Sequence, residues 1–308
     1  MNPDLEDHMT ARRTESDEAA TPESNGSRPT GVLHGLIAAL RLLLPIGRVG
    51  SSLPLRAYAA APHWLILIGL LIGMAWAGLF RVTWRVYGET GSLRPVPVLA
   101  VILLECCFTG AFFILGFTRA FQSLTGPRPV TQGVDKNAPF TQHATLALCL
   151  LILVQFTLIL SIPNETPWWP SSDWRARFNF LYPAPIYRPL ILAPLWGRWG
   201  MLVAACVGRS ARTADPDIAA FASAVRPIHL LAHAVLPLVL SAIYCAREGN
   251  FLVGIKLGLL VFGVTYLASV GMARRGGGQT RYSIYAAAQI AQLAALAIHR
   301  AFWAEIHG

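Results

Sequence analysis

The sequence predicts an all-α polytopic membrane helical bundle of about seven transmembrane helices, preceded by a short interfacial helix. Of its 308 residues, 54% are hydrophobic and only 13% are charged, whereas about 25% of residues are charged in a soluble domain. The mean hydropathy is +0.49. Several apolar runs reach or approach the roughly 20 residues that a helix needs to cross a bilayer. Helices suit such runs because they satisfy all their backbone hydrogen bonds internally.

The predicted elements follow one another with little polar sequence between them. Residues 31–46 form an apolar segment of roughly 16 residues, too short for a full span and therefore expected to lie at the membrane interface. Arg198 interrupts one of the later runs, and the last run is rich in Ala and Gln. The seven predicted spans are residues 62–80, 95–117, 143–162, 190–208, 228–246, 251–272 and 283–303.

Charge is distributed unevenly along the chain. Residues 1–30 hold seven acidic residues and three arginines, a net charge of −4. Because the whole chain carries a net charge of +9, the remaining 278 residues carry +13. We expect residues 1–30 to be a disordered acidic tail and residues 31–308 to form one transmembrane domain. Since the basic residues lie between apolar spans, they indicate contact with anionic lipid headgroups and a topology signal, and not nucleic-acid binding.

Lys and Arg counts predict the orientation. With the N-terminus inside, the connections between the seven spans place twelve basic residues on the inner side and eight on the outer side. The positive-inside rule therefore predicts a cytoplasmic N-terminus in a bacterial inner (cytoplasmic) membrane. The polar start contains no apolar segment typical of a cleavable signal peptide. The five cysteines form no CxxC pair and are expected to be free thiols.

Ionisable residues within apolar runs are candidates for function, because burying them in a membrane is costly. Glu105 is the only acidic residue deep in a span; it could pair with an arginine of the bundle or line a transport path. Arg198 could hold a phosphate-like anion or serve the structure alone. Lys256 is expected to face the interior of the bundle. His229 and His233 share a helix face, but no third metal ligand is identifiable, which favours ordinary interfacial histidines.

Two pairs of glycines have the spacing that allows close helix packing. They are Gly69 with Gly73 and Gly254 with Gly258. We expect both pairs to pack helices within one chain, and the alternative is that they mediate dimerisation.

The segment FTGAFFILGFTRAFQSL at residues 108–124 resembles the signature of cobalamin synthase (adenosylcobinamide-GDP ribazoletransferase), TGxxHxDGxxDxxDG. Thr109, Gly110 and Gly116 retain the frame of that signature. Its His and three Asp positions carry other residues, which are Phe113, Leu115, Arg119 and Gln122. Since divalent cations such as Mg²⁺ are bound by oxygen ligands, mostly carboxylates, the resemblance implies a metal site that has been lost.

Two later segments carry the same resemblance. LAPLWGRWGM, at residues 192–201, is similar to the family's LAPxxGRWAM and contains Arg198. ARRGGGQTRYSIYAAAQIAQL, at residues 273–293, is similar to RRLGGxTGDxLGAxxELxEL. In the latter, Gly277, Gly278 and Thr280 are retained, whereas the Gly-Asp pair is replaced by Arg281 and Tyr282 and two Glu by Gln289 and Gln292. A Lys that is frequent in another span of the family is replaced by Gln155.

The resemblance implies a membrane enzyme that joins α-ribazole or its phosphate to adenosylcobinamide-GDP and releases GMP, with Mg²⁺. Because the acidic positions are neutral or basic here, we expect a divergent, catalytically impaired or inactive homologue without a metal cofactor. Its expected partners are the lipid bilayer, a corrinoid or nucleotide-phosphate ligand, and an intact homologue or further copies of the chain. The substrate-binding positions implied are Thr109, Gly110, Gly116, Arg119, Gln122, Arg198, Gly277, Gly278, Thr280, Arg281 and Gln289.

Two further expectations concern these positions. Residues 113–122 should lie close to Arg281 and Tyr282 in the folded chain, and Arg119, Arg198 and Arg281 could together form an anion pocket. Two alternative functions remain open. One is an active transferase whose Mg²⁺ ligands come from elsewhere, such as Glu105 and Asp135. The other is an unrelated small-molecule transporter with Glu105, Arg198 and Lys256 along its pathway.

Overall fold

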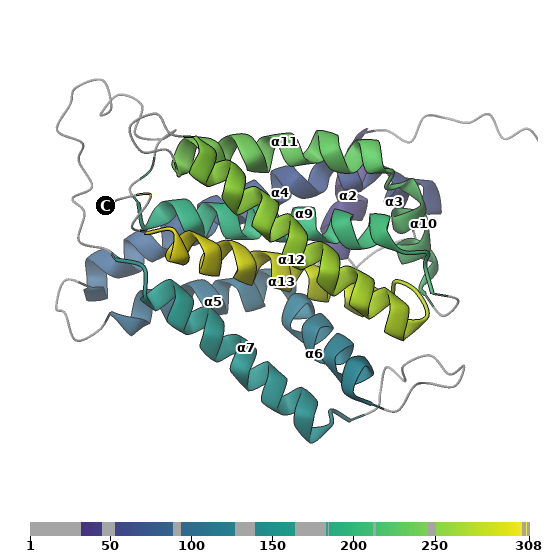
Figure 1. Ribbon diagram of the computed structural model, residues 1–308, viewed down its shortest axis with the longest axis horizontal. Helices are drawn as coiled ribbons and strands as arrows, with labels where there is room; N and C mark the ends of the chain where they lie inside the picture. Colours follow the sequence, from purple (N-terminus) through teal and green to yellow (C-terminus); the bar gives the residue numbers. More distant parts are fainter. Residues whose placement is uncertain are drawn as a thin grey trace, which may run out of the picture. The chain divides into compact units, whose positions relative to one another are not determined.

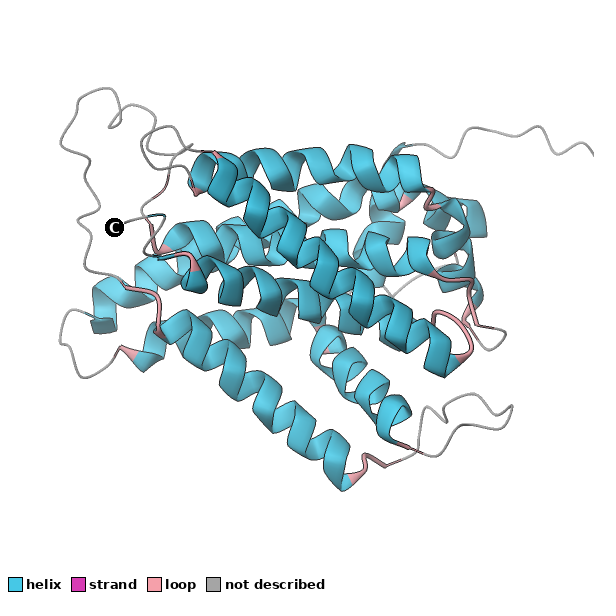
Figure 2. Ribbon diagram, in the orientation of Figure 1, coloured by secondary structure: helices cyan, strands magenta, loops and turns pink. Residues whose placement is uncertain are grey.

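The computed structural model describes residues 32–44, 53–88, 94–126, 139–163, 183, 185–211, 214–245, 251–303 and 306. These residues form helices packed side by side, with no strand in the described part beyond one isolated bridge between Ser210 and Gln279 (Figures 1 and 2). The all-α prediction is confirmed. The acidic tail and residues 164–182 lie outside the described part.

The elements are α2 (Val32–Leu43), α3 (Leu55–Ala60), α4 (Pro62–Thr83) with a π-helical turn η2 (Trp84–Gly88), α5 (Pro95–Thr109), α6 (Phe112–Thr125), α7 (Gln142–Leu160), α9 (Tyr187–Val207), α10 (Pro216–Ala224), α11 (Pro227–Tyr244), α12 (Leu252–Gly276) and α13 (Arg281–Ala301). Among the described helices, five are long and apolar enough to cross a membrane: α4, α7, α9, α11 and α12. The broken pair α5 and α6 adds a sixth if it counts as one span. The expected seventh, α13, is equally long but carries polar residues, most of which are buried against other helices rather than exposed to lipid.

The expected single span at residues 95–117 is wrong, because the chain breaks there into α5 and α6, which are bent by 83° (Figure 1). Gly110 and Ala111 both have φ of +57°. Glycine adopts this left-handed conformation without steric cost, and two such residues in succession redirect the helix axis. Thr109 at the end of α5 donates its hydroxyl to the carbonyl of Glu105 at 2.7 Å. The break cannot be predicted from hydropathy, because α5 and α6 are both apolar.

Helix α9 forms the centre of the described helices, since every residue from Tyr187 to Ala205 is buried. Small residues let its neighbours approach closely. A Cβ at Gly73 of α4 would lie 2.5 Å from the carbonyl oxygen of Ile191, and one at Gly200 would lie 2.7 Å from the Cβ of Ala291 in α13. Helices α4 and α13 therefore pack closely on α9 through these glycines.

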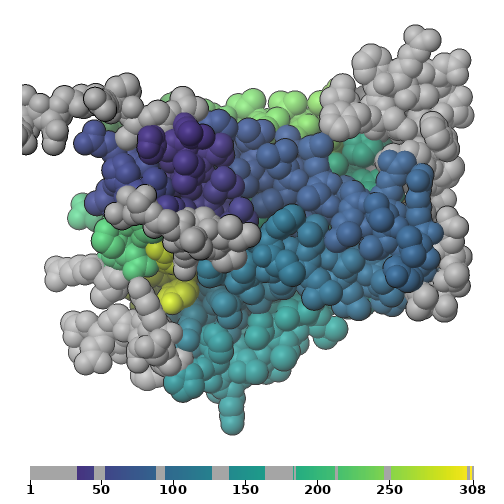
Figure 3. All heavy atoms as spheres, turned by 180° about the vertical axis from the view of Figure 1, so that it is seen from behind, coloured from purple at the N-terminus to yellow at the C-terminus, as the bar shows by residue number. Residues whose placement is uncertain are grey.

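The face of the molecule opposite to that in Figure 1 is formed mainly by α2 to α7 (Figure 3).

The second glycine pair also packs within the chain. Gly254 and Gly258 of α12 lie against Ser241 and Leu238 of α11, and Gly258 also faces the ring of Trp196. Trp196 donates its indole N–H to the hydroxyl of Ser241 at 2.9 Å, which ties α9 to α11. Both glycine pairs therefore pack helices inside the monomer, as predicted.

Replacing Gly73 with alanine should lower the thermal unfolding midpoint of the purified protein in detergent. The added methyl group meets backbone atoms of α9, and overpacking typically costs about 1–3 kcal/mol. Gly78→Ala on the same helix is the matched control, because nothing lies within 4 Å of the added Cβ. That control should be neutral or slightly stabilising, since alanine is the better helix former. Equal midpoints for the two variants would contradict the close packing of α4 on α9.

Candidate functional site

The buried carboxylate of Glu105, near the end of α5, is the centre of a polar network within the helices. Its side chain is completely buried. Gln155 of α7 donates its amide to one carboxylate oxygen at 2.6 Å, and Gln292 of α13 donates to the other at 2.7 Å. Both oxygens of the carboxylate therefore accept a hydrogen bond from an amide.

The two amides extend the network to further helices. The carbonyl oxygen of Gln155 accepts a hydrogen bond from Gln289 at 2.9 Å, and that of Gln292 accepts one from Nη1 of Arg198 at 3.3 Å. All five side chains are at most 1% exposed. The network thus joins α5, α7, α9 and α13, and Gln292 bridges the negative charge of Glu105 and the positive charge of Arg198.

Arg198 lies in the interior of α9 and is fully buried. Its guanidinium carbon is 4.4 Å from the centre of the Phe113 ring of α6, close enough for a cation–π interaction. Its Nε and Nη2 groups have no hydrogen-bond partner within the described residues, nor has the carbonyl oxygen of Gln289. Glu105 is therefore linked to Arg198 through Gln292, and no direct ion pair joins the two charged groups among the described residues.

The two motif segments that resemble the family meet in space, as predicted. The rings of Phe113 and Tyr285 contact edge to face with centroids 5.3 Å apart. A Cβ added at Gly116 would collide with Tyr285 and lie 3.3 Å from the carbonyl oxygen of Tyr282. Helix α6 therefore packs directly on the first turns of α13, and Gly116 makes that approach possible.

The three arginines of the expected anion pocket have different surroundings. Arg119 lies over the ring of Phe140, 4.3 Å from its centre, and its Nη1 is 3.4 Å from the side-chain oxygen of Gln122. Arg281 forms two ion pairs, with Asp215 at 2.8 Å and Asp217 at 2.6 Å. Arg198 lies in the network of Glu105, so each arginine already has partners of its own.

Nothing in the sequence pointed to the two aspartates that bind Arg281, which lie between the predicted spans 190–208 and 228–246. They lie at the start of α10, an unexpected short helix, at the same end of the described helices as the turn between α12 and α13 (Figure 1). A pairing across more than sixty residues leaves no local pattern in the sequence.

The N–H groups of the glycine turn between α12 and α13 form hydrogen bonds with backbone carbonyls of the chain. Gly277 ends α12 with φ of +68°. The N–H of Gly278 bonds to the carbonyl of Ala273 at 2.9 Å, and that of Gln279 to the carbonyl of Arg209 at 2.8 Å. Thr280 begins α13 in a capping box with Ser283. The N–H groups of Gly278 and Gln279 are therefore already used, which argues against a phosphate cradle here.

The donor set does not fit Mg²⁺, the metal that the family resemblance implies. The acidic motif positions carry apolar, amide, phenol or guanidinium side chains. The one carboxylate that is buried among the described residues, that of Glu105, has both oxygens hydrogen-bonded and lies beside a guanidinium. Mg²⁺ requires oxygen ligands in a near-octahedral arrangement. In the described part of the chain, no group of three or more His, Cys, Asp and Glu residues is arranged to hold a metal ion. Asp135 lies outside the described residues.

Two further expectations from the sequence concern the histidines of α11 and Lys256 of α12. His63 of α4 joins His229 and His233, with ring centroids 5.9 Å and 5.3 Å from its own, a grouping that the sequence could not reveal. The prediction that Lys256 faces the interior is wrong, because its side chain is exposed. Helix α12 begins at Leu252, so Lys256 lies near a helix end and not in the middle of a span. This position removes Lys256 from the network and from any buried pathway.

Comparison with known proteins identifies one relationship. The family model for cobalamin-5-phosphate synthase matches residues 35–299. No curated protein and no solved structure matches the chain significantly. The matched range contains every residue of the polar network.

Removing both charges of the network should destabilise the protein by less than the sum of the two single removals. Arg198→Gln leaves the carboxylate of Glu105 buried without its cation, which typically costs about 3–5 kcal/mol. The double variant Glu105→Gln with Arg198→Gln replaces the charge pair by amides, so its loss of stability should be smaller than the sum of the single losses. Thermal unfolding of the three variants and the wild type measures the coupling. Additive losses would show that the two charges do not depend on each other.

Proposed function

Because the chain belongs to the cobalamin-5-phosphate synthase family, we propose that it is a multi-pass member that has lost magnesium-dependent ribazole transfer. In this proposal it no longer joins α-ribazole to adenosylcobinamide-GDP. It serves instead as a ligand-binding protein or as a partner subunit of an intact homologue. The family match and the apolar helices support the membrane location and the link to cobalamin biosynthesis.

One observation carries the loss of activity. A metal-dependent transfer between phosphate-bearing substrates needs carboxylate oxygens that are free to bind the cation. Glu105 is the one acidic residue in the described network, and amides of Gln155 and Gln292 occupy both of its oxygens. Arg198 supplies the compensating positive charge that a bound cation would otherwise bring. The other side chains of the network, Gln289 among them, are neutral amides.

Ligand binding is supported by the part of Arg198 that the network does not use. Its Nε and Nη2 groups lie on one edge of the guanidinium, the edge that binds two oxygens of a phosphate or carboxylate group side by side. Neither nitrogen has a hydrogen-bond partner within the described residues. A corrinoid or nucleotide that carries a phosphate group offers the matching oxygens. Because the side chain is fully buried, binding would require α6 or α13 to move.

The purified protein in lipid nanodiscs should release no GMP from adenosylcobinamide-GDP and α-ribazole in the presence of Mg²⁺. Calorimetry should likewise show no specific heat of Mg²⁺ binding, because the carboxylate ligands are missing. A homologue that retains the TGxxHxDGxxDxxDG signature, assayed in parallel, is the positive control. GMP release, or a stoichiometric Mg²⁺ site in the micromolar range, would favour an active enzyme with relocated ligands.

Inorganic phosphate, GMP or cobinamide phosphate should raise the thermal midpoint if Arg198 binds oxyanions. A ligand at 100 times its Kd stabilises the folded state by about 2.7 kcal/mol. Arg198→Lys should fold, since it retains a positive charge near Glu105, but should lose this rise because an ammonium group has no planar edge for two oxygens. The same rise in the lysine variant, or no rise in the wild type, would leave Arg198 a purely structural residue.

A further inference from the structure

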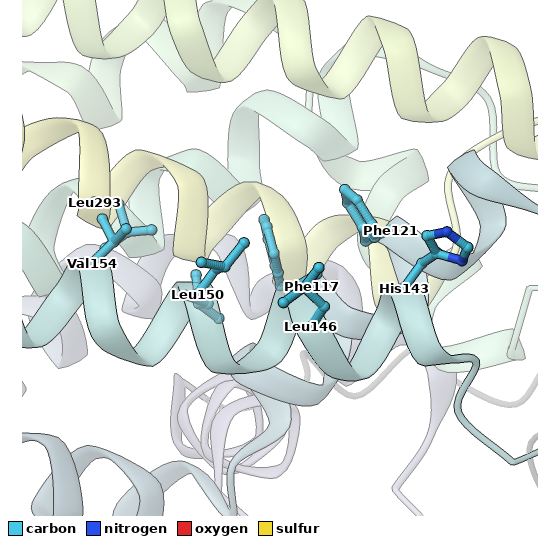
Figure 4. Close-up of a pocket in the computed structure, with 9 residues that line it drawn as sticks. Phe117, Phe121, His143, Leu146, Leu150, Val154 and Leu293 are labelled. Carbon is cyan, nitrogen blue, oxygen red and sulfur yellow. The ribbon is translucent and has the colours of Figure 1, made fainter.

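A groove between α6, α7 and α13 lies outside the polar network and is not used by the proposed function. It has a volume of about 290 Å³. Phe117 and Phe121 of α6 form one wall, Leu150 and Val154 of α7 the other, and Leu293 of α13 lies at one end (Figure 4). All these lining side chains are apolar, so the groove offers nothing that would hold a polar molecule along its length.

The groove opens toward the surroundings of α7, which is a candidate membrane span with less than a third of its apolar window buried. Two of the lining side chains, Leu146 and Leu150, are 58% and 49% exposed. In the membrane these surfaces face hydrocarbon and not water, so the available occupant is an alkyl chain.

The length of the groove matches one half of a bilayer. His143 lies at the start of α7 and Val154 eleven residues further on, which corresponds to about 16 Å at the helical rise of 1.5 Å per residue. One leaflet of a typical hydrocarbon core is about 15 Å thick. Val154 immediately precedes Gln155, where the polar network begins. On a helix that crosses the bilayer, a groove of this length corresponds to one leaflet.

One polar side chain lies at the open end of the groove. His143 is an exposed side chain that points toward Phe121 at this end (Figure 4), and among the described residues it is the one polar residue that lines the groove. A histidine at a membrane face can contact a lipid phosphate. The groove therefore has a polar end and an apolar length, which match the head and one chain of a phospholipid.

We propose that this groove binds one acyl chain of a phospholipid from the leaflet at the N-terminal end of α7, with its headgroup phosphate beside His143. The proposal does not depend on the loss of transferase activity, and it identifies a specific lipid site on a helix that has few protein neighbours. A tryptophan at position 150 would fill the groove from its α7 wall. Leu153 gives a matched control, because it is 56% exposed on the same helix and does not line the groove.

The test uses full-length protein in detergent after delipidation, titrated with dioleoyl phosphatidylglycerol and followed by native mass spectrometry and thermal unfolding. Wild type and Leu153→Trp should retain one lipid more than Leu150→Trp at the same lipid concentration. The lipid-induced rise of the midpoint should be lost in Leu150→Trp alone, with at least about tenfold weaker binding, which is about 1.4 kcal/mol. Equal retention in both tryptophan variants would overturn the site.

Two further readouts distinguish the occupant and its headgroup. If the wild type is a dimer that Leu150→Trp converts to a monomer, a second copy of the chain fills the groove and the lipid proposal is wrong. His143→Ala should reduce the preference for phosphatidylglycerol over dioleoylglycerol, which lacks the phosphate. An unchanged preference would show that no headgroup is recognised at this end and would overturn that half of the proposal.

Discussion

A single buried carboxylate constrains the arrangement of four helices. Glu105 is completely buried, and an ionised group in such a place needs both hydrogen bonds and an opposite charge. The hydrogen bonds come from Gln155 and Gln292, and the opposite charge from Arg198 through Gln292. Because these partners lie on α7, α13 and α9, none of the three helices can shift against α5 without leaving a polar group unsatisfied.

The glutamines supply hydrogen bonds on both sides of this network. A side-chain amide both donates and accepts, so Gln155 donates to Glu105 while it accepts from Gln289, and Gln292 donates to Glu105 while it accepts from Arg198. Glutamates at 289 and 292, as the family signature has them, would place further negative charges beside Glu105, and like charges at close range oppose ionisation. The amides therefore make the retention of Glu105 compatible with the absence of metal ligands.

Sequence patterns predicted the positions of the helices better than the contacts between them. The length of the apolar runs predicted α11 and α12 to within a few residues, because lipid exposure demands continuous apolar sequence. The break at Gly110 and Ala111 was not predicted, because a hydropathy profile does not depend on backbone conformation. The resemblance to the family signature correctly predicted that α6 and the start of α13 pack together. The ion pairs of Arg281 with α10 and the approach of His63 to His229 could not be foreseen, because long-range pairing depends on how helices pack.

Helix α7 shows how the polar network and the apolar groove act on the same element. Most of its surface faces away from the protein, and its buried polar link to the other helices is Gln155, two-thirds of the way along it. The part that precedes Gln155 is held by apolar contacts with α6 and borders the groove. Apolar contacts have no preferred direction, so they allow this part of α7 to adjust its position, whereas hydrogen bonds fix the position of Gln155. The position of α7 is therefore set at one point by the charge of Glu105 and, before that point, by apolar packing.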